Sequence, residues 1–252
     1  MSLHPEQRKV IPNRLKYLNP TLTDYVGRTT TKIIPNNAGT FNANSQITIE
    51  LPQSTSNFAD FQNSYLSMNV QLTNAVADKV SFDDSSASFI KRLTLKSSAG
   101  NVLEDIVNYN ELCAVSELLT SSQGYTGSVG QILDGTSSKF ATAGGTPNTY
   151  SAGGADRIAL AKAGGRRCIK LISGILQSTQ LFPMNKGLII EIYLTTAEEA
   201  GGGTDAVGAS TLTVTDVAFI LDSVQVSPEY QIAYDQQFNT SAFILLVVCN
   251  LV

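Results

Sequence analysis

The sequence predicts an all-β fold, an antiparallel eight-stranded sandwich with one short helix and long loops. Several segments alternate apolar and polar residues with a period of two, which is typical of strands that bury one face. Only one segment changes to a helical period. No repeat with a period of about 20–50 residues occurs, so neither a solenoid nor a propeller is expected. Strands joined by long connections favour a jelly roll among the sandwiches.

The first part of the chain, residues 1–45, is predicted to be an extended basic arm ahead of a jelly-roll domain at residues 46–252. The arm lacks sustained periodicity and contains several prolines. Its basic residues could contact nucleic acid, an anionic lipid or an acidic neighbour, and a solvated tail is the alternative. The candidate contact residues of the arm are Arg8, Lys9, Arg14 and Lys16.

Strand patterns begin after the arm. Residues 46–51 (QITIEL) and 65–73 (YLSMNVQLT) alternate apolar with polar side chains. Residues 89–96 and 102–106 form a predicted hairpin, with Ala-Gly-Asn at its turn. Further strands are predicted after residue 166, at 167–173, 188–195, 211–215 and 217–226.

A helix is predicted directly after the hairpin, at residues 108–121. Its apolar residues fall on one helical face and are expected to pack against the sandwich. Asn108 or Asn110 could cap the first turn, because an Asn side chain accepts hydrogen bonds from free amides there. The predicted buried stripe consists of Leu112, Val115, Leu118 and Leu119.

Two regions of the chain stand apart from this pattern. Residues 121–165 are rich in Gly, Ser, Thr and Ala, which predicts a long loop inserted in the domain. The apolar run 242–248 (AFILLVV) is too short to span a bilayer and predicts a core strand. Because the chain stops soon after this run, we expect a final strand that is cut short or that packs under a continuation.

The composition argues against most chemistry. Charged residues make up 15% of the chain and the net charge is −4, which does not favour a dedicated nucleic-acid binder. The only histidine is His4, and the three cysteines have no metal-ligand or disulfide spacing. Ser-His-Asp or Cys-His catalysis therefore lacks its residues. We expect no enzyme, no cofactor and no metal site.

Paired acids are the remaining candidates for acid/base work. Glu104 and Asp105 are neighbours on a predicted strand, so their side chains should point to opposite faces. We interpret both as structural or contact residues. Cys113, on the predicted helix, is expected to serve packing rather than reactivity.

Three stretches together carry a family resemblance. FIKRLTLKSSAGNVLEDIVNYNELCAVSELL (89–119) reads as a strand, a tight turn, a second strand and an amphipathic helix. RRCIKLISGILQSTQLFPMNKGLIIEIYLT (166–195) reads as two strands joined by a compact connector, and DVAFILDSVQVSPEYQIAY (216–234) as a last strand with a link. This order of elements resembles the amino-terminal jelly roll of double-jelly-roll major capsid proteins of eukaryotic DNA viruses, of the Polinton-like virus and virophage type.

The resemblance implies a structural viral capsid protein that self-assembles into capsomers of an icosahedral virion shell. The implied partners are further copies, in a trimeric capsomer or in a pentamer if the chain is a penton, together with neighbouring and minor capsid proteins. It implies location in the virion, with assembly inside the host cell, and possible contact of the arm with an internal membrane or nucleic acid. Since the chain has room for one jelly roll, both a single and a truncated double form stay open.

Two other classes remain as alternatives. A carbohydrate- or receptor-binding β sandwich, such as a fibre or lectin-like module, would use the long loop at 121–165. The aromatic residues available there are Tyr125, Phe140 and Tyr150. A glycosidase-like enzyme would need two carboxylates close together in one cleft.

Overall fold

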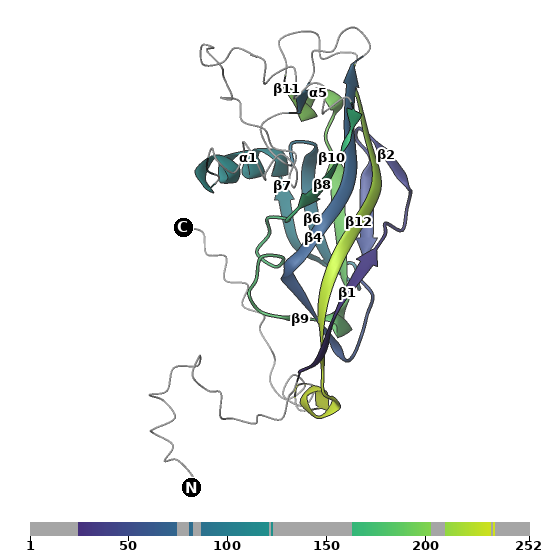
Figure 1. Cartoon of the computed structure of the whole chain (residues 1–252), viewed down its shortest axis with the longest axis vertical. Helices are drawn as coiled ribbons and strands as arrows, with labels where there is room; N and C mark the ends of the chain where they lie inside the picture. The colour runs from purple at the N-terminus through teal and green to yellow at the C-terminus, as the bar shows by residue number, and fades with distance from the viewer. Residues whose placement is uncertain are drawn as a thin grey trace.

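Two antiparallel sheets lie face to face, and one helix runs sideways out beyond them (Figure 1). This arrangement is seen in a computed structural model. The residues that it describes are 25–74, 81–82, 87–120, 122, 163–202, 210–232 and 234.

The first sheet has the strand order β1-β12-β4-β8, and the second has the order β3-β10-β6-β7. Short β2 pairs with β12, short β9 pairs with β4, and a separate two-stranded sheet joins β11 to β5. The strands of the first sheet are β1 (Tyr25–Ile33), β2 (Thr40–Asn42), β4 (Asn57–Asn74), β8 (Gly165–Ile169), β9 (Phe182–Pro183) and β12 (Ser210–Val226). The remaining strands are β3 (Gln46–Glu50), β5 (Ser81–Phe82), β6 (Ile90–Ser97), β7 (Val102–Val107), β10 (Leu188–Leu194) and β11 (Gly201–Gly202).

Nested pairing of the strands defines the fold as a jelly roll. The hairpin β6–β7 is the innermost pair, and around it β4 pairs with β8, β3 with β10, and β1 with β12, all antiparallel. The chain therefore behaves as one long hairpin that is folded over into two sheets. β12 also bonds to β4, and β10 also bonds to β6. Each sheet therefore contains a row of four neighbouring strands.

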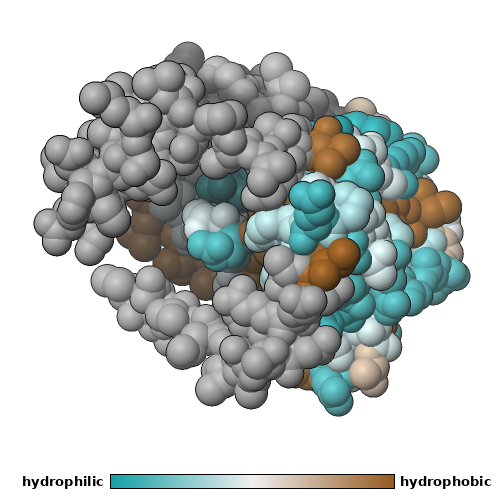
Figure 2. All heavy atoms as spheres, turned by 90° about the horizontal axis from the view of Figure 1, so that it is seen from below, coloured by the Kyte–Doolittle hydropathy of each residue, from teal (hydrophilic) through white to brown (hydrophobic). Residues whose placement is uncertain are grey.

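The space between the sheets is filled by one continuous apolar core. Alternation produces it: in β3, Ile47 and Ile49 are fully buried while their neighbours are partly or fully exposed. β4 contributes Leu66, Met68 and Val70 in the same way. Seen from below, the described surface at that end of the sandwich is mostly hydrophilic, with hydrophobic residues in separate small groups (Figure 2).

The predicted strands of both sheets are confirmed, with shifts of their ends. β3, β6, β7 and β10 lie at the predicted positions, and β4 begins earlier, at Asn57. The strands predicted at 211–215 and 217–226 are one continuous strand, β12. It passes through Asp216, whose φ of 50° falls in the left-handed region, and the pairing with β4 shifts there. The jelly-roll fold class is as predicted.

The predicted domain start at residue 46 is wrong for the second half of the arm. Residues Tyr25–Ile33 form β1 and pair with β12, so they belong to the sandwich. The sequence YVGRTTTKI did not predict this strand, because most of its side chains are exposed and it lacks an alternation of apolar and polar residues. The predicted arm contacts Arg8, Lys9, Arg14 and Lys16 lie outside the described residues. The same holds for most of the loop at 121–165 and for the terminal run 242–248.

Helices are few in the part of the chain that the structure describes. α1 spans Tyr109–Thr120, as predicted within one residue at each end. The short α5 (Ala197–Ala200) starts at Thr196, whose side chain accepts a hydrogen bond from the amide of Glu199. A 3-10 turn, η3 (Met184–Lys186), connects β9 to β10 and ends at Gly187.

Substitution of Gly187 by Ala should destabilise the sandwich strongly. Gly187 has a φ of +63°, and an added Cβ would lie 2.8 Å from both the Gln53 side-chain amide and the Ser98 Cβ. We expect Gly187→Ala to lower the free energy of unfolding by about 2–4 kcal/mol in urea titrations, since steric overlap adds to backbone strain.

Gly100→Ala provides the matched control. Gly100 also has a positive φ, +85°, but nothing lies within 4 Å of its added Cβ. Gly100→Ala should lower the free energy of unfolding by about 1 kcal/mol, because only backbone strain is added. Equal losses for the two variants would contradict the close contact described at Gly187.

Candidate assembly surface

Helix α1 is fixed to the sandwich through its first turns. Tyr109 is fully buried, and its hydroxyl oxygen accepts a 2.6 Å hydrogen bond from the amide of Ile172. Cys113, one helical turn further on, is 2% exposed. Burial raises the pKa of Tyr109 well above its usual value and raises the pKa of the Cys113 thiol to about 12. Both groups are therefore neutral packing residues, as expected for Cys113.

The strand before the helix holds a second attachment point. The Glu104 carboxylate accepts hydrogen bonds from the Ser173 hydroxyl at 2.6 Å and from the amides of Gly174 and Ile175 at 2.8 and 3.3 Å. These residues follow β8, so β7 and the connection from β8 towards β10 are joined by one carboxylate. Charge-assisted bonds to two amides and a hydroxyl are strong, and they stabilise this turn.

Asp105 points to the opposite face of β7, as its position next to Glu104 predicts. It accepts two 2.6 Å bonds from the Arg92 guanidinium and a 3.0 Å bond from the Thr94 hydroxyl. The hydrogen bond from Arg92 holds the pKa of Asp105 below its usual value. Glu104 and Asp105 are thus structural residues, which is the interpretation reached from the sequence.

An apolar surface accompanies these attachment points. Most of the large hydrophobic side chains that are exposed in the described part of the chain lie on β7 and α1. We define the β7–α1 apolar surface as Val102, Leu103, Val107, Leu112, Val115 and Leu119. These residues follow one another along β7 and α1. Exposed apolar side chains that adjoin in one patch mark interaction sites more often than single ones do, so this set is a candidate contact surface.

The predicted buried stripe of the helix is wrong in its orientation. Leu112, Val115 and Leu119 are 40%, 56% and 78% exposed. The side chain of Leu118 lies outside what the structure describes. The buried face is instead that of Tyr109 and Cys113, about 100° around the helix, or one residue step. The sequence does place Tyr109 and Cys113 four residues apart, which puts them on one helical face. The longer apolar stripe of Leu112, Val115 and Leu119 led to the wrong prediction.

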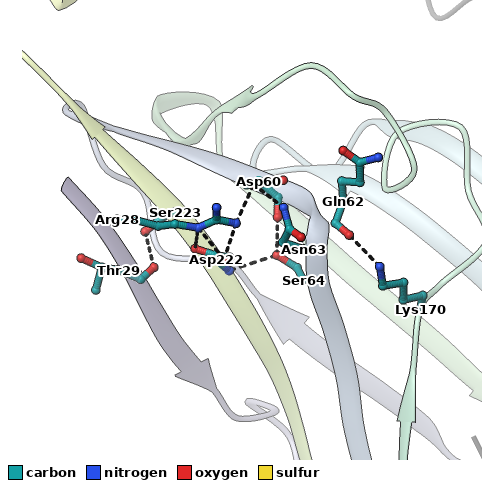
Figure 3. A network of polar contacts seen from close by, with 9 residues as sticks. All are labelled: Arg28, Thr29, Asp60, Gln62, Asn63, Ser64, Lys170, Asp222 and Ser223. Atoms are coloured by element: carbon teal, nitrogen blue, oxygen red, sulfur yellow. Dashed lines mark hydrogen bonds and ion pairs between the residues drawn. The ribbon is translucent and has the colours of Figure 1, made fainter. Parts of the chain in front are cut away.

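A polar network outside this surface holds β1 in place (Figure 3). Arg28 donates to both carboxylate oxygens of Asp222 at 2.8 and 2.7 Å and to Asp60 at 2.8 Å. The Ser64 hydroxyl donates to the Asp60 carbonyl and accepts from the Asp222 amide. The register of β4 against β12 shifts between Ile220 and Asp222. The Ser64 hydroxyl therefore bonds backbone groups that have no partner in the regular strand pairing at this point.

A surface hollow of about 320 Å³ lies beside this network. Its lining mixes apolar and neutral polar side chains with one lysine, whose ammonium bonds the Gln62 carbonyl at 3.0 Å. No carboxylate, thiol or imidazole lines it, so it offers no acid/base pair. Its lining residues are Phe61, Gln62, Ser64, Lys170, Leu171, Leu176, Gln177 and Phe219.

The described residues contain no group of three or more His, Cys, Asp or Glu side chains that could hold a metal ion. None of the helices in this part of the chain has the length and apolar character needed to cross a membrane. What the geometry offers is a rigid sandwich with contact surfaces.

Comparison with known proteins gives matches among solved structures. The chain resembles VP54 of PBCV-1, fitted into a reconstruction of the virophage Sputnik, with 9% identity and a TM-score of 0.48. It resembles the mavirus major capsid protein with 12% identity and a TM-score of 0.45, and the Faustovirus major capsid protein with 11% and 0.41. No family model and no curated protein sequence matches the chain.

These matches extend over most of the chain and about half of each matched protein. They cover 84%, 86% and 92% of this chain, and 46%, 52% and 59% of the three structures. The mavirus and Faustovirus structures are major capsid proteins. The jelly-roll assignment itself rests on the strand pairing of this chain.

Removal of the Glu104 carboxylate should loosen the turn at 173–175. We expect Glu104→Ala to lower the free energy of unfolding by about 1.5–3 kcal/mol, because two amides lose a charged acceptor. The amides of Gly174 and Ile175 should also exchange hydrogen faster in the native state. Asp105→Ala, the control on the opposite face, breaks an ion pair that is largely exposed and should cost about 1 kcal/mol or less. A larger effect of Asp105→Ala would contradict this assignment.

The Cys113 thiol should resist alkylation in the native state. In a Cys249→Ser background at pH 8, we expect iodoacetamide to modify the partly exposed Cys168 first. Cys113 should react on the order of a thousandfold more slowly, because thiolate is the nucleophile and its folded pKa is about 12. Since the folded pKa exceeds the unfolded value, this thiol's contribution to stability is complete below about pH 8.5 and is lost as the pH rises towards 12. Equal labelling rates, measured by mass spectrometry, would contradict the burial.

Proposed function

We propose that the chain is a structural protein of a viral capsid, which self-assembles into capsomers of an icosahedral shell. The observation that carries this proposal is the combination of a jelly-roll sandwich with the exposed β7–α1 apolar surface. A shell subunit needs a rigid body and surfaces that copies of itself can cover. The sequence resemblance of residues 89–119, 166–195 and 216–234 to capsid jelly rolls supports the same role.

A non-enzymatic role is part of the proposal. Glu104 and Asp105, the paired acids of β7, are both engaged in contacts within the sandwich. The hollow beside β4 has one lysine and no carboxylate, thiol or imidazole, so it lacks an acid/base pair. The chain's only histidine is His4, so nucleophilic systems that need an imidazole are not supported by the sequence.

The finer features of the assembly are also proposals. We propose a homo-oligomer, either a trimeric capsomer or, for a penton, a pentamer, with neighbouring and minor capsid proteins as further partners. Its location is the virion, after assembly inside the host cell. The basic arm residues Arg8, Lys9, Arg14 and Lys16 would contact an internal membrane or nucleic acid in the particle.

Assembly should depend on the apolar side chains of α1. We expect the double substitution Val115→Lys and Leu119→Lys to abolish assemblies larger than a dimer of the purified chain, because charged groups would be buried without partners. Both positions are more than half exposed in the single chain, so the free energy of unfolding should change by less than about 0.5 kcal/mol. Mass photometry and negative-stain electron microscopy measure the outcome.

Leu181→Lys is the matched control, because Leu181 is also an exposed leucine but belongs to neither β7 nor α1. It should leave assembly unchanged. If the α1 double variant assembles as the unmodified chain does, the surface is not the contact. If the unmodified chain stays monomeric and binds glycans through residues 121–165, the carbohydrate-binding alternative replaces the capsid role.

A further inference from the structure

Strand β1 is exposed on both of its faces. It is nine residues long, yet Val26 and every residue from Arg28 to Lys32 are exposed, while Gly27 and Ile33 are half-buried. Successive side chains of a strand point to opposite faces, so neither face of β1 is covered by the opposite sheet.

One edge of β1 is nevertheless firmly held. It pairs with β12 from Tyr25 to Ile33. The Ser223 hydroxyl donates to the Thr29 carbonyl at 3.1 Å, and Arg28 bonds Asp60 and Asp222 (Figure 3). The strand is therefore anchored, and the positive charge of Arg28 is compensated within its own chain.

The other edge presents backbone groups. Among the described residues, β1 pairs with β12 and with no other strand. Natural edge strands are protected by prolines, charged side chains, β-bulges or short length. β1 has a register shift between Tyr25 and Gly27 and two charged residues, Arg28 and Lys32, and Arg28 is bonded to Asp60 and Asp222. From Gly27 onwards the strand is regular, has no proline, and contains three consecutive threonines, whose β-branched side chains favour strands. This edge is suited to receive a further strand.

We propose that the edge of β1 that no other described strand covers pairs with β1 of a second copy, antiparallel about a two-fold axis perpendicular to the sheet. The sheets that contain β1 in the two copies would then form one continuous sheet. Because such an axis keeps each side chain on its own face, a residue must face either itself or a residue at an even separation. The possible registers therefore centre on single residues of β1.

Charge and the length of the paired stretch together favour the register centred on Thr29. A register centred on Arg28 faces two arginines, and one centred on Thr30 faces Arg28 with Lys32. With Thr29 opposite Thr29, Arg28 faces Thr30 and Lys32 faces Val26, so like charges are apart. This register also pairs the regular stretch from Gly27 to Thr31 with its copy, beyond the register shift between Tyr25 and Gly27. The contact is independent of the β7–α1 apolar surface.

The test uses opposite charges at the two-fold axis, in the full chain that also carries Val115→Lys and Leu119→Lys. This background removes the contact of the proposed capsid function, so the two proposals fail separately. We expect it to dimerise reversibly in sedimentation velocity. Thr29→Lys and Thr29→Asp, each alone, should lower the association constant about tenfold or more, because like charges would face each other. An equimolar mixture of the two should restore the dimer.

Thr211→Lys is the control, because Thr211 is an exposed threonine on β12 that faces Thr73 of β4. It should dimerise as the background does. A background that is monomeric at every concentration overturns the proposal, and so does a mixture that fails to restore dimers lost in the single variants. Monomers whose β1 amides are all protected from hydrogen exchange would show that the chain's own residues occupy this edge, which also overturns it.

Discussion

The nested antiparallel pairing of strands is the constraint on which the rest of the structure depends. Each strand from β1 to β6 bonds to a strand later in the chain, with the β6–β7 hairpin innermost and β1–β12 outermost. Each alternating strand has one apolar face, so the long hairpin can bury its apolar residues only by folding into two facing sheets. The core, the edges and the exit points of the loops all follow from this arrangement.

Two edge strands, β7 in one sheet and β1 in the other, have many side chains that the core of the sandwich does not cover. β7 is the last strand of one sheet. On its outer side no further strand is described, and the contacts there are those of Glu104 with residues 173–175 and of Tyr109 with Ile172. Helix α1 leaves the sandwich there with its apolar stripe outward. β1 ends the other sheet with both faces exposed. A subunit with a continuous apolar core and such edges is suited to association.

The sequence predicted the alternating strands and the helix because period and composition agree there. It missed β1, whose Thr29-Thr30-Thr31 run has no apolar face, since this strand is held by backbone pairing and by Arg28. It also placed Leu112, Val115 and Leu119 in the core. Hydropathy alone cannot distinguish a stripe that packs within the chain from one that is left for a partner, and the buried Tyr109 contains a hydroxyl that needs a specific amide.

The fixed contacts of Glu104 and Tyr109 depend on residues far apart in sequence, which no local pattern specifies. The central claim is that the sandwich has its own apolar core and that other copies of the chain cover its exposed apolar side chains. A cryo-electron microscopy reconstruction of particles assembled from the full chain tests it most directly. The account predicts that Val115 and Leu119 lie in contact with a second protein copy. Particles in which α1 faces solvent, with copies joined through other surfaces, would contradict it.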